Sequence, residues 1–190
     1  MRKEIHSIKN EQGVSLLEAL IVLSIVAIIS ASSLPSLGKL INKFQVEGSL
    51  ENLRKAIASS RHLAISSGDI VTLCPAEGEQ CSNDWDSAYM IFVDYNNNAM
   101  LDDEEKPYEI TAVDSSMQIS WRASGGAAYL KFSPTGIARQ FGRFHICKKD
   151  ADLSAARSMV INRQGRVRLY QDRDRDGIVE DIDGRQPDCL

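Results

Sequence analysis

A stretch of 21 residues, 14–34, contains a single ionisable side chain, that of Glu18. At 1.5 Å per residue, a helix of this length is about 30 Å long, which matches the hydrocarbon thickness of a bilayer. A carboxylate inside such a span costs about 2.5–3.5 kcal/mol. The stretch therefore predicts a transmembrane helix in which Glu18 needs a compensating charge.

The residues before this stretch form a short polar leader, 1–13, which ends at Gly13. A cleavable secretory signal is the alternative interpretation, with cleavage near the small residues Ser30–Ser32. That alternative leaves the carboxylate of Glu18 unexplained. Snorkelling of Glu18 to the interface is also disfavoured, because the residue lies almost a full turn inside the span.

Apolar residues continue at steps of three and four beyond the span, which is typical of one face of an amphipathic helix. They are Leu40, Phe44, Val46, Leu50, Leu53, Ile57 and Ala64. The pattern predicts that the helix continues to about Ser67, where Gly68 provides a stop. The predicted N-terminal helix thus covers 14–67.

The remainder of the chain, 68–190, predicts a β-rich globular domain. Seven short apolar segments separated by glycine and proline turns are expected to be strands. They are 70–74, 89–94, 117–121, 129–132, 144–147, 158–162 and 166–170. The fold class expected from these elements is α+β.

Gly13, the apolar stretch that begins at Val14, and the acid at its fifth position resemble the N-terminal signal of type IV pilins and type II secretion pseudopilins. The resemblance implies that prepilin peptidase cleaves after Gly13 and methylates the new amine of Val14, although Phe is usual at that position. It also implies a role for Glu18 in assembly, where its carboxylate meets the N-terminal amine of a neighbouring subunit.

Motifs later in the chain are similar, in their order, to those of the GspH/FimT branch of the pilin superfamily. They are "VTLCP", "IFVDYNNNAMLDDEE", "FSPTGIA", "FHIC" and "VINRQGRVRLY". The resemblance implies a pilin-like hydrophobic helix packed on the β-rich domain, anchored by a single pass in the inner membrane with the domain in the periplasm. The implied partners are prepilin peptidase and other pilin or pseudopilin subunits.

Two functions follow from this resemblance. One is a minor pilin that helps to initiate or cap a type IV pilus, and some members of the branch also bind DNA during natural transformation. The other is a type II secretion pseudopilin that acts in protein secretion. The chain contains no sequence motif typical of a catalytic site, so no enzymatic activity is expected.

A basic segment, 139–168, has eight arginines and lysines against two aspartates, whereas the whole chain has a net charge of −4. Within it, "GRVR" resembles the DNA-binding motif of FimT-type pilins, which implies a site for double-stranded DNA at Gly165, Arg166 and Arg168. Arg163 is added to the candidate site because the turn at Gly165 is expected to present the two arginines beside it. If Val167 points into the core, Arg166 and Arg168 share the solvent face. The alternative is an ordinary solvated strand face.

An acidic segment near the C-terminus has oxygen-bearing side chains at the spacing of a calcium loop, with Gly177 at the turn. The candidate ligands are Asp172, Asp174, Asp176, Glu180 and Asp183. Calcium is therefore a candidate cofactor, and a solvated acidic tail is the alternative. Oxygen-bearing residues in the segment 94–105 have a similar spacing, but Ala99 replaces the glycine, which favours a hairpin loop there.

The four cysteines are an even number behind a membrane-targeting segment, which favours disulfides in an oxidising compartment over free buried thiols. Cys74 and Cys81 enclose a short loop after a strand. Cys189, close to the end of the chain, is expected to return to Cys147.

Overall fold

The computed structural model describes residues 14–150, 153–180, 184–187 and 189, with the backbone alone for 31–36. Gly13 and the leader lie outside the described residues. The chain divides into two compact units, 1–39 and 40–190. The α-helix α1 (Leu16–Ser67) has its first half in one unit and its second half in the other.

The first unit contains the apolar beginning of α1. Glu18 lies in the first turn of the helix, where the free backbone N–H groups favour a negative charge. Among the described residues, no helical segment is both long and apolar enough to cross a bilayer.

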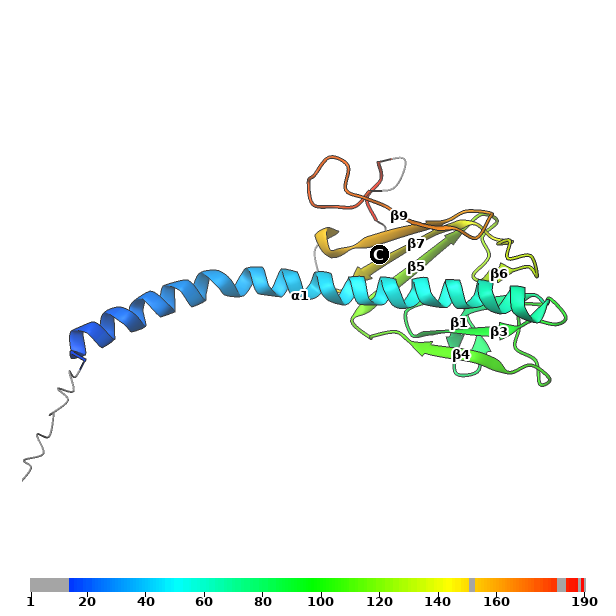
Figure 1. Cartoon of the computed structure of the whole chain (residues 1–190), viewed down its shortest axis with the longest axis horizontal. Helices are drawn as coiled ribbons and strands as arrows, with labels where there is room; N and C mark the ends of the chain where they lie inside the picture. The colour runs from blue at the N-terminus through cyan, green and yellow to red at the C-terminus, as the bar shows by residue number, and fades with distance from the viewer. Residues whose placement is uncertain (1–13, 151–152, 181–183, 188, 190) are drawn as a thin grey trace, which may run out of the picture. The chain divides into compact units, whose positions relative to one another are not determined.

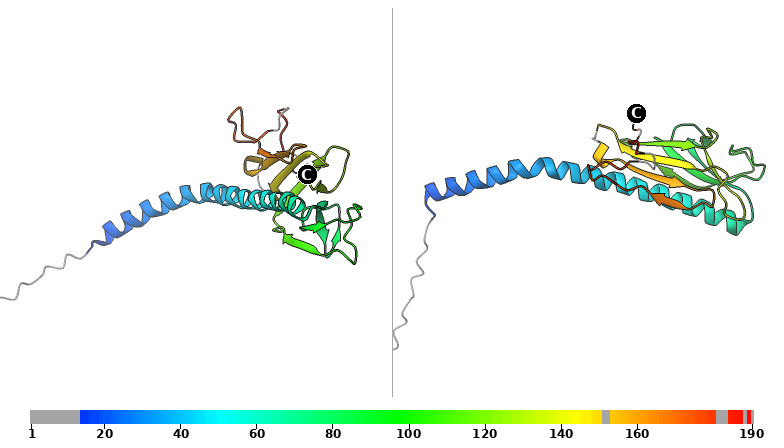
Figure 2. Two further views of the ribbon diagram at one scale, coloured as in Figure 1. Left: turned by 45° about the vertical axis from the view of Figure 1, so that its right-hand side comes forward. Right: turned by 90° about the horizontal axis from the view of Figure 1, so that it is seen from above.

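The second unit contains two antiparallel sheets, and the views in Figures 1 and 2 place both against the half of α1 drawn in cyan. One sheet has the order β2-β1-β3-β4, with β6 also paired to β1. Its strands are β1 (Val71–Glu77), β2 (Gln80–Cys81), β3 (Ala88–Val93), β4 (Pro107–Ala112) and β6 (Leu130–Phe132). The other sheet has the order β5-β7-β8-β9. Its strands are β5 (Met117–Ala123), β7 (Gly142–Lys148), β8 (Arg157–Ile161) and β9 (Val167–Leu169), and a short 3-10 helix, η1 (Leu153–Ala155), precedes β8.

The main core joins α1 to both sheets. Five members of the predicted helical stripe are buried in it, namely Val46, Leu50, Leu53, Ile57 and Ala64. Leu40 and Phe44 are helical, as predicted, but they are 47% and 66% exposed and lie outside this core. The helical part of the core begins at Val46, so these two residues precede the part of α1 that packs on the strands.

Strand β1 is buried on both faces, because successive side chains of a strand point in opposite directions. Val71 and Leu73 join the main core, whereas Cys74 and Ala76 belong to a second cluster with Phe92 and other residues. This burial explains why β1 is apolar almost throughout instead of alternating.

All seven expected strands are present, and two further strands were not expected. Strand β2 has only two residues, and β4 is an edge strand that begins with Pro107 and whose side chains are all exposed or half-buried. Strand β2 is too short to show an alternation, whereas β4 does alternate, with apolar Tyr108, Ile110 and Ala112 separated by polar residues, and it was missed.

Candidate functional site

A groove of about 550 Å³ lies between the second half of α1 and strand β9. The helix contributes one wall, and the turn before β9 together with β9 itself contributes the other. The lining residues are Arg54, Lys55, Ile57, Ala58, Arg61, His62, Ile65, Gly165, Arg166, Val167 and Arg168.

The groove is strongly basic, since five of its lining side chains are arginine or lysine and none of the described lining residues is acidic. Arg166 and Arg168 are exposed, whereas Val167 between them packs against the main core. Both arginines therefore share the solvent face. A concave surface lined by one sign of charge concentrates ions of the opposite sign, so the groove is suited to anions.

A tight turn between β8 and β9 positions the two arginines. The N–H of Gly165 donates to the carbonyl of Asn162 at 2.9 Å, and the N–H of Arg166 donates to the Asn162 side chain at 2.9 Å. Gly165 has φ +71, and a Cβ there would lie 3.0 Å from the carbonyl oxygen of Gly136. The turn thus requires glycine both for its backbone conformation and for its close packing.

Arg61 connects the helical wall to this turn. Its Nε donates to the carbonyl oxygen of Gly136 at 3.0 Å, and its Cδ lies 3.3 Å from the position of a Cβ on Gly165. One N–H of the Arg61 guanidinium is therefore used in a contact that joins the helix to the neighbouring turns.

The remaining basic residues of 139–168 do not join Arg166 and Arg168 in the groove. The guanidinium of Arg163 lies 5.3 Å from the centre of the Phe141 ring, beside a separate hollow, so the expected grouping of Arg163 with Arg166 and Arg168 is not observed. Arg157 forms an ion pair with Glu47 at 2.7 Å. The basic segment is thus divided over several surfaces.

Three cationic residues of the groove were missed by the sequence analysis, namely Arg54, Lys55 and Arg61. Their signal was the spacing of seven residues between Arg54 and Arg61, which places these two on one face of a helix, with Lys55 adjacent to Arg54. The sequence does not tell which strand lies beside that face, so the pairing with β9 was not predictable.

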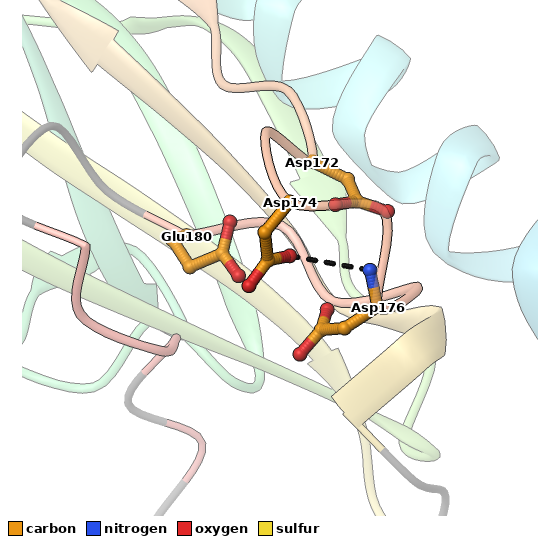
Figure 3. Close-up of side chains that lie close together, drawn as sticks. All are labelled: Asp172, Asp174, Asp176 and Glu180. Atoms are coloured by element: carbon orange, nitrogen blue, oxygen red, sulfur yellow. Dashed lines mark hydrogen bonds between the residues drawn. The ribbon is translucent and has the colours of Figure 1, made fainter.

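The acidic segment after β9 brings four of its five candidate ligands together, as Figure 3 shows. One carboxylate oxygen from each of Asp172, Asp174, Asp176 and Glu180 lies within 4.8 Å of the others. The Asp172 carboxylate also accepts hydrogen bonds from the N–H groups of Arg175 and Gly177 at 2.6 and 3.0 Å. The fifth candidate, Asp183, lies outside the described residues.

Two disulfides are present, Cys74–Cys81 and Cys147–Cys189, as expected. The first closes the β1–β2 hairpin. The second ties β7 to the segment that follows the acidic loop, so both ends of that loop are attached to the same sheet through β9 and Cys147.

A comparison with protein families decides the classification of the chain. A family model described as the type II transport protein GspH matches residues 49–169. The chain belongs to the GspH family. The matched region runs from the second half of α1 to the end of β9, and it includes every residue that lines the basic groove.

A second family model, the prokaryotic N-terminal methylation motif, matches residues 8–34 of this GspH-family chain. The match contains Gly13, Val14 and Glu18. No curated protein sequence matches the chain.

Solved structures similar to this GspH-family chain include two crystal forms of the type IV minor pilin FimU from Pseudomonas aeruginosa PAO1. One has a TM-score of 0.51 and 16% identity, and covers 66% of this chain and 92% of FimU. The other has a TM-score of 0.52 and 15% identity, with 66% and 88% covered. The minor pseudopilin EpsH of the Vibrio cholerae type 2 secretion system has a TM-score of 0.48 and 12% identity, with 66% and 95% covered. The family and the α+β fold expected from the motifs are confirmed.

Proposed function

We propose that this chain is a minor pilin of a type IV pilus, which helps to initiate or cap the filament and binds double-stranded DNA through the basic groove. The observation that supports DNA binding is the placement of Arg166 and Arg168 in a groove with three further cationic residues. Guanidinium groups bind phosphate oxygens bidentately, and phosphate contacts supply most of the non-specific affinity for DNA.

The alternative function is that of a type II secretion pseudopilin whose work is confined to contacts with other subunits. The family description favours this class, whereas FimU is a type IV minor pilin. We favour the pilus because contacts between subunits in protein secretion require no groove for a polyanion.

Processing and anchorage are part of the proposal and rest on the N-terminal methylation motif. Prepilin peptidase cleaves after Gly13 and methylates Val14, and Glu18 then pairs with the amine of a neighbouring subunit. Before assembly the N-terminal segment is held in the inner membrane, with the domain in the periplasm.

A fluorescence anisotropy titration of a short labelled DNA duplex with the full chain in neutral detergent tests the DNA proposal. We expect binding without sequence preference and a Kd of about 1–100 μM at physiological salt. The double variant Arg166→Gln/Arg168→Gln should lose most of this binding. Arg139→Gln removes an exposed arginine outside the groove and is the matched control. Arg163→Gln should weaken DNA binding less than the double variant, because Arg163 lies beside Phe141 and not in the groove. Absence of binding at low salt would leave subunit assembly as the whole function.

Calcium binding by the acidic loop is a second proposed activity. Calcium takes oxygen ligands at about 2.3–2.6 Å, so oxygens around one ion lie up to about 5 Å apart. The four carboxylates that gather within 4.8 Å satisfy this requirement. Asp183 would supply a fifth ligand in the calcium-loop pattern.

Isothermal titration of the full chain with calcium chloride tests this second activity. We expect saturable binding that Asp172→Asn/Asp176→Asn abolishes. Glu104→Gln removes an exposed acid elsewhere and should leave the binding unchanged. Equal heats for the wild type and the double variant would show that the loop is a solvated acidic segment.

A further inference from the structure

We infer that helix α1 is the second phosphate-binding wall of the groove. Glu51 lowers the phosphate affinity of this wall by pairing with Arg54. In this arrangement Arg54 and Lys55 bind phosphates of the same polyanion that Arg166 and Arg168 bind. The inference rests on the proposed DNA binding and adds to it a second set of binding residues.

The first support is the distribution of charge over the two walls. Arg54 and Lys55 are exposed and lie across the groove from Arg166 and Arg168. The lining part of the helix runs from Arg54 to Ile65, which at 1.5 Å per residue is about 16 Å. Phosphates of one DNA strand rise by about 3.4 Å each, so this length accommodates several phosphates. Paired cations on both walls of such a groove are matched to an extended polyanion rather than to a single ion.

The second support is the shape of the wall between the cations. Ala58 and Ile65 line the groove on the same face of the helix as Arg54, because they follow it by four and eleven residues. They are small or apolar and offer no competing negative charge. A phosphodiester backbone can therefore approach the helix along its length.

Arg54 is restrained by a partner just outside the groove. Its Nε and Nη2 donate to the two carboxylate oxygens of Glu51 at 2.7 and 2.8 Å. The two side chains are 52% and 42% exposed, and exposed pairs of this kind contribute little to stability. The guanidinium of Arg54 can therefore release the Glu51 carboxylate and bind a phosphate instead. The carboxylate thus competes with DNA for Arg54.

The structure separates Arg61 from these binding residues. The Nε of Arg61 donates to the carbonyl of Gly136, in the turn after β6 that packs closely against Gly165. Arg61 therefore acts as a positioning residue that holds the helix near the turn before β9. The two walls are thereby held at a constant separation, which pre-organises the four phosphate-binding side chains.

The experiment compares the salt dependence of DNA binding for the full chain in neutral detergent with that of two helix variants. With four phosphate contacts, the slope of log K against log salt should be about −3.6 for the wild type. Lys55→Gln should weaken binding several-fold and reduce the slope by about 0.9, which is one contact. Glu51→Gln should have the opposite effect and tighten binding, because Arg54 is released.

Lys43→Gln is the matched control, since Lys43 is an exposed lysine of the same helix that does not line the groove. Thermal unfolding of each variant should match the wild type, because all the substituted side chains are at least partly exposed. A gain of affinity in Glu51→Gln cannot result from misfolding, so this variant keeps the test decisive.

The outcomes separate the inference from the proposed function. If Arg166→Gln/Arg168→Gln abolishes DNA binding while Lys55→Gln and Glu51→Gln bind as the wild type, the inference is wrong and the proposed function stands. If the wild type binds no DNA, the DNA-binding part of the proposed function fails, and isothermal titration with tripolyphosphate decides the inference alone. Binding of tripolyphosphate that Lys55→Gln weakens supports the second wall, and no binding or unchanged binding overturns it.

Discussion

The Nζ of Lys131 lies 2.8 Å from the Oδ2 of Asp94, and the two side chains are only 4% and 0% exposed. Lys131 also donates to the carbonyl and side-chain oxygens of Asn97, both at 2.9 Å. The Asp94 carboxylate accepts further hydrogen bonds from the hydroxyl of Thr72 at 2.6 Å and the N–H of Asn98 at 2.9 Å. A lysine from β6 thus organises the loop 94–105. The spacing of oxygen-bearing residues in this loop resembles that of a calcium loop, but here the oxygen atoms of Asp94 and Asn97 contact an ammonium group.

Removing the ammonium should be strongly destabilising, because it leaves a buried carboxylate without its counter-charge. We expect Lys131→Met to lower the free energy of unfolding by about 3–5 kcal/mol, measured by urea denaturation. The double variant Asp94→Asn/Lys131→Met should recover much of this loss. A cost for Lys131→Met no larger than that of the exposed Lys106→Met would contradict the interpretation.

The same pair predicts a pH dependence. Burial alone raises the pKa of Asp94, but hydrogen bonds from Lys131 and Thr72 and the charge of Lys131 outweigh it, so the pKa lies below its ordinary value. A carboxyl with a lowered folded pKa stabilises the fold above its unfolded pKa of about 3.9, and this contribution is lost as the pH falls through the folded pKa. The stability difference between the wild type and Asp94→Asn should therefore be constant near neutral pH and shrink below about pH 4. A difference that grows on acidification would be inconsistent with this sign.

Glycine at the turn before β9 should be essential for the groove. Gly165→Ala places a Cβ 3.0 Å from the carbonyl oxygen of Gly136 at φ +71, and we expect a loss of about 2–5 kcal/mol from backbone strain and overpacking. Gly78 has φ +63 with open space around it, so Gly78→Ala should cost only about 1–2 kcal/mol. Chemical denaturation of both variants measures the difference, and equal costs would show that the close packing is unimportant.

The two disulfides should differ in their contribution to stability. In the chain-entropy model, the Cys147–Cys189 bridge, with a sequence separation of 42, contributes about 4 kcal/mol, and the Cys74–Cys81 bridge, with a separation of 7, about 2.5 kcal/mol. Denaturation of the two double Cys→Ala variants tests this order. A larger loss for the Cys74–Cys81 variant would show that contacts of the β1–β2 hairpin, rather than loop entropy, dominate.

Processing makes a separate prediction for the N-terminus. The intact mass of the membrane form should correspond to a chain that begins at Val14 and carries a methyl group, whereas a start near Ser32 would indicate an ordinary signal peptide. Glu18→Ala should still be cleaved yet fail to enter filaments, because the amine of the neighbouring subunit loses its partner. Glu109→Ala, which changes an exposed acid of β4, is the control and should be incorporated normally.

Several features could be predicted from the sequence because they depend on neighbours along the chain. The helical stripe from Val46 to Ala64 and the apolar strands follow from periodicity, which is set by the geometry of a single element. The turn at Gly165 and the gathering of Asp172, Asp174 and Asp176 are also local, since they depend on a few consecutive residues. Edge strand β4 also carried a local signal, since Tyr108, Ile110 and Ala112 alternate with polar residues, and it was predictable in the same way.

The placement of charges was decided by the tertiary structure. Arg163 and Arg166 are three residues apart, yet one lies beside Phe141 and the other in the groove. Arg54 and Arg166 are more than a hundred residues apart and line the same groove. Lys131 meets Asp94 only because β6 and β3 both pair with β1. Composition and spacing determine which elements form, but the environment of a charge depends on which elements pack together, and that is a property of the whole core.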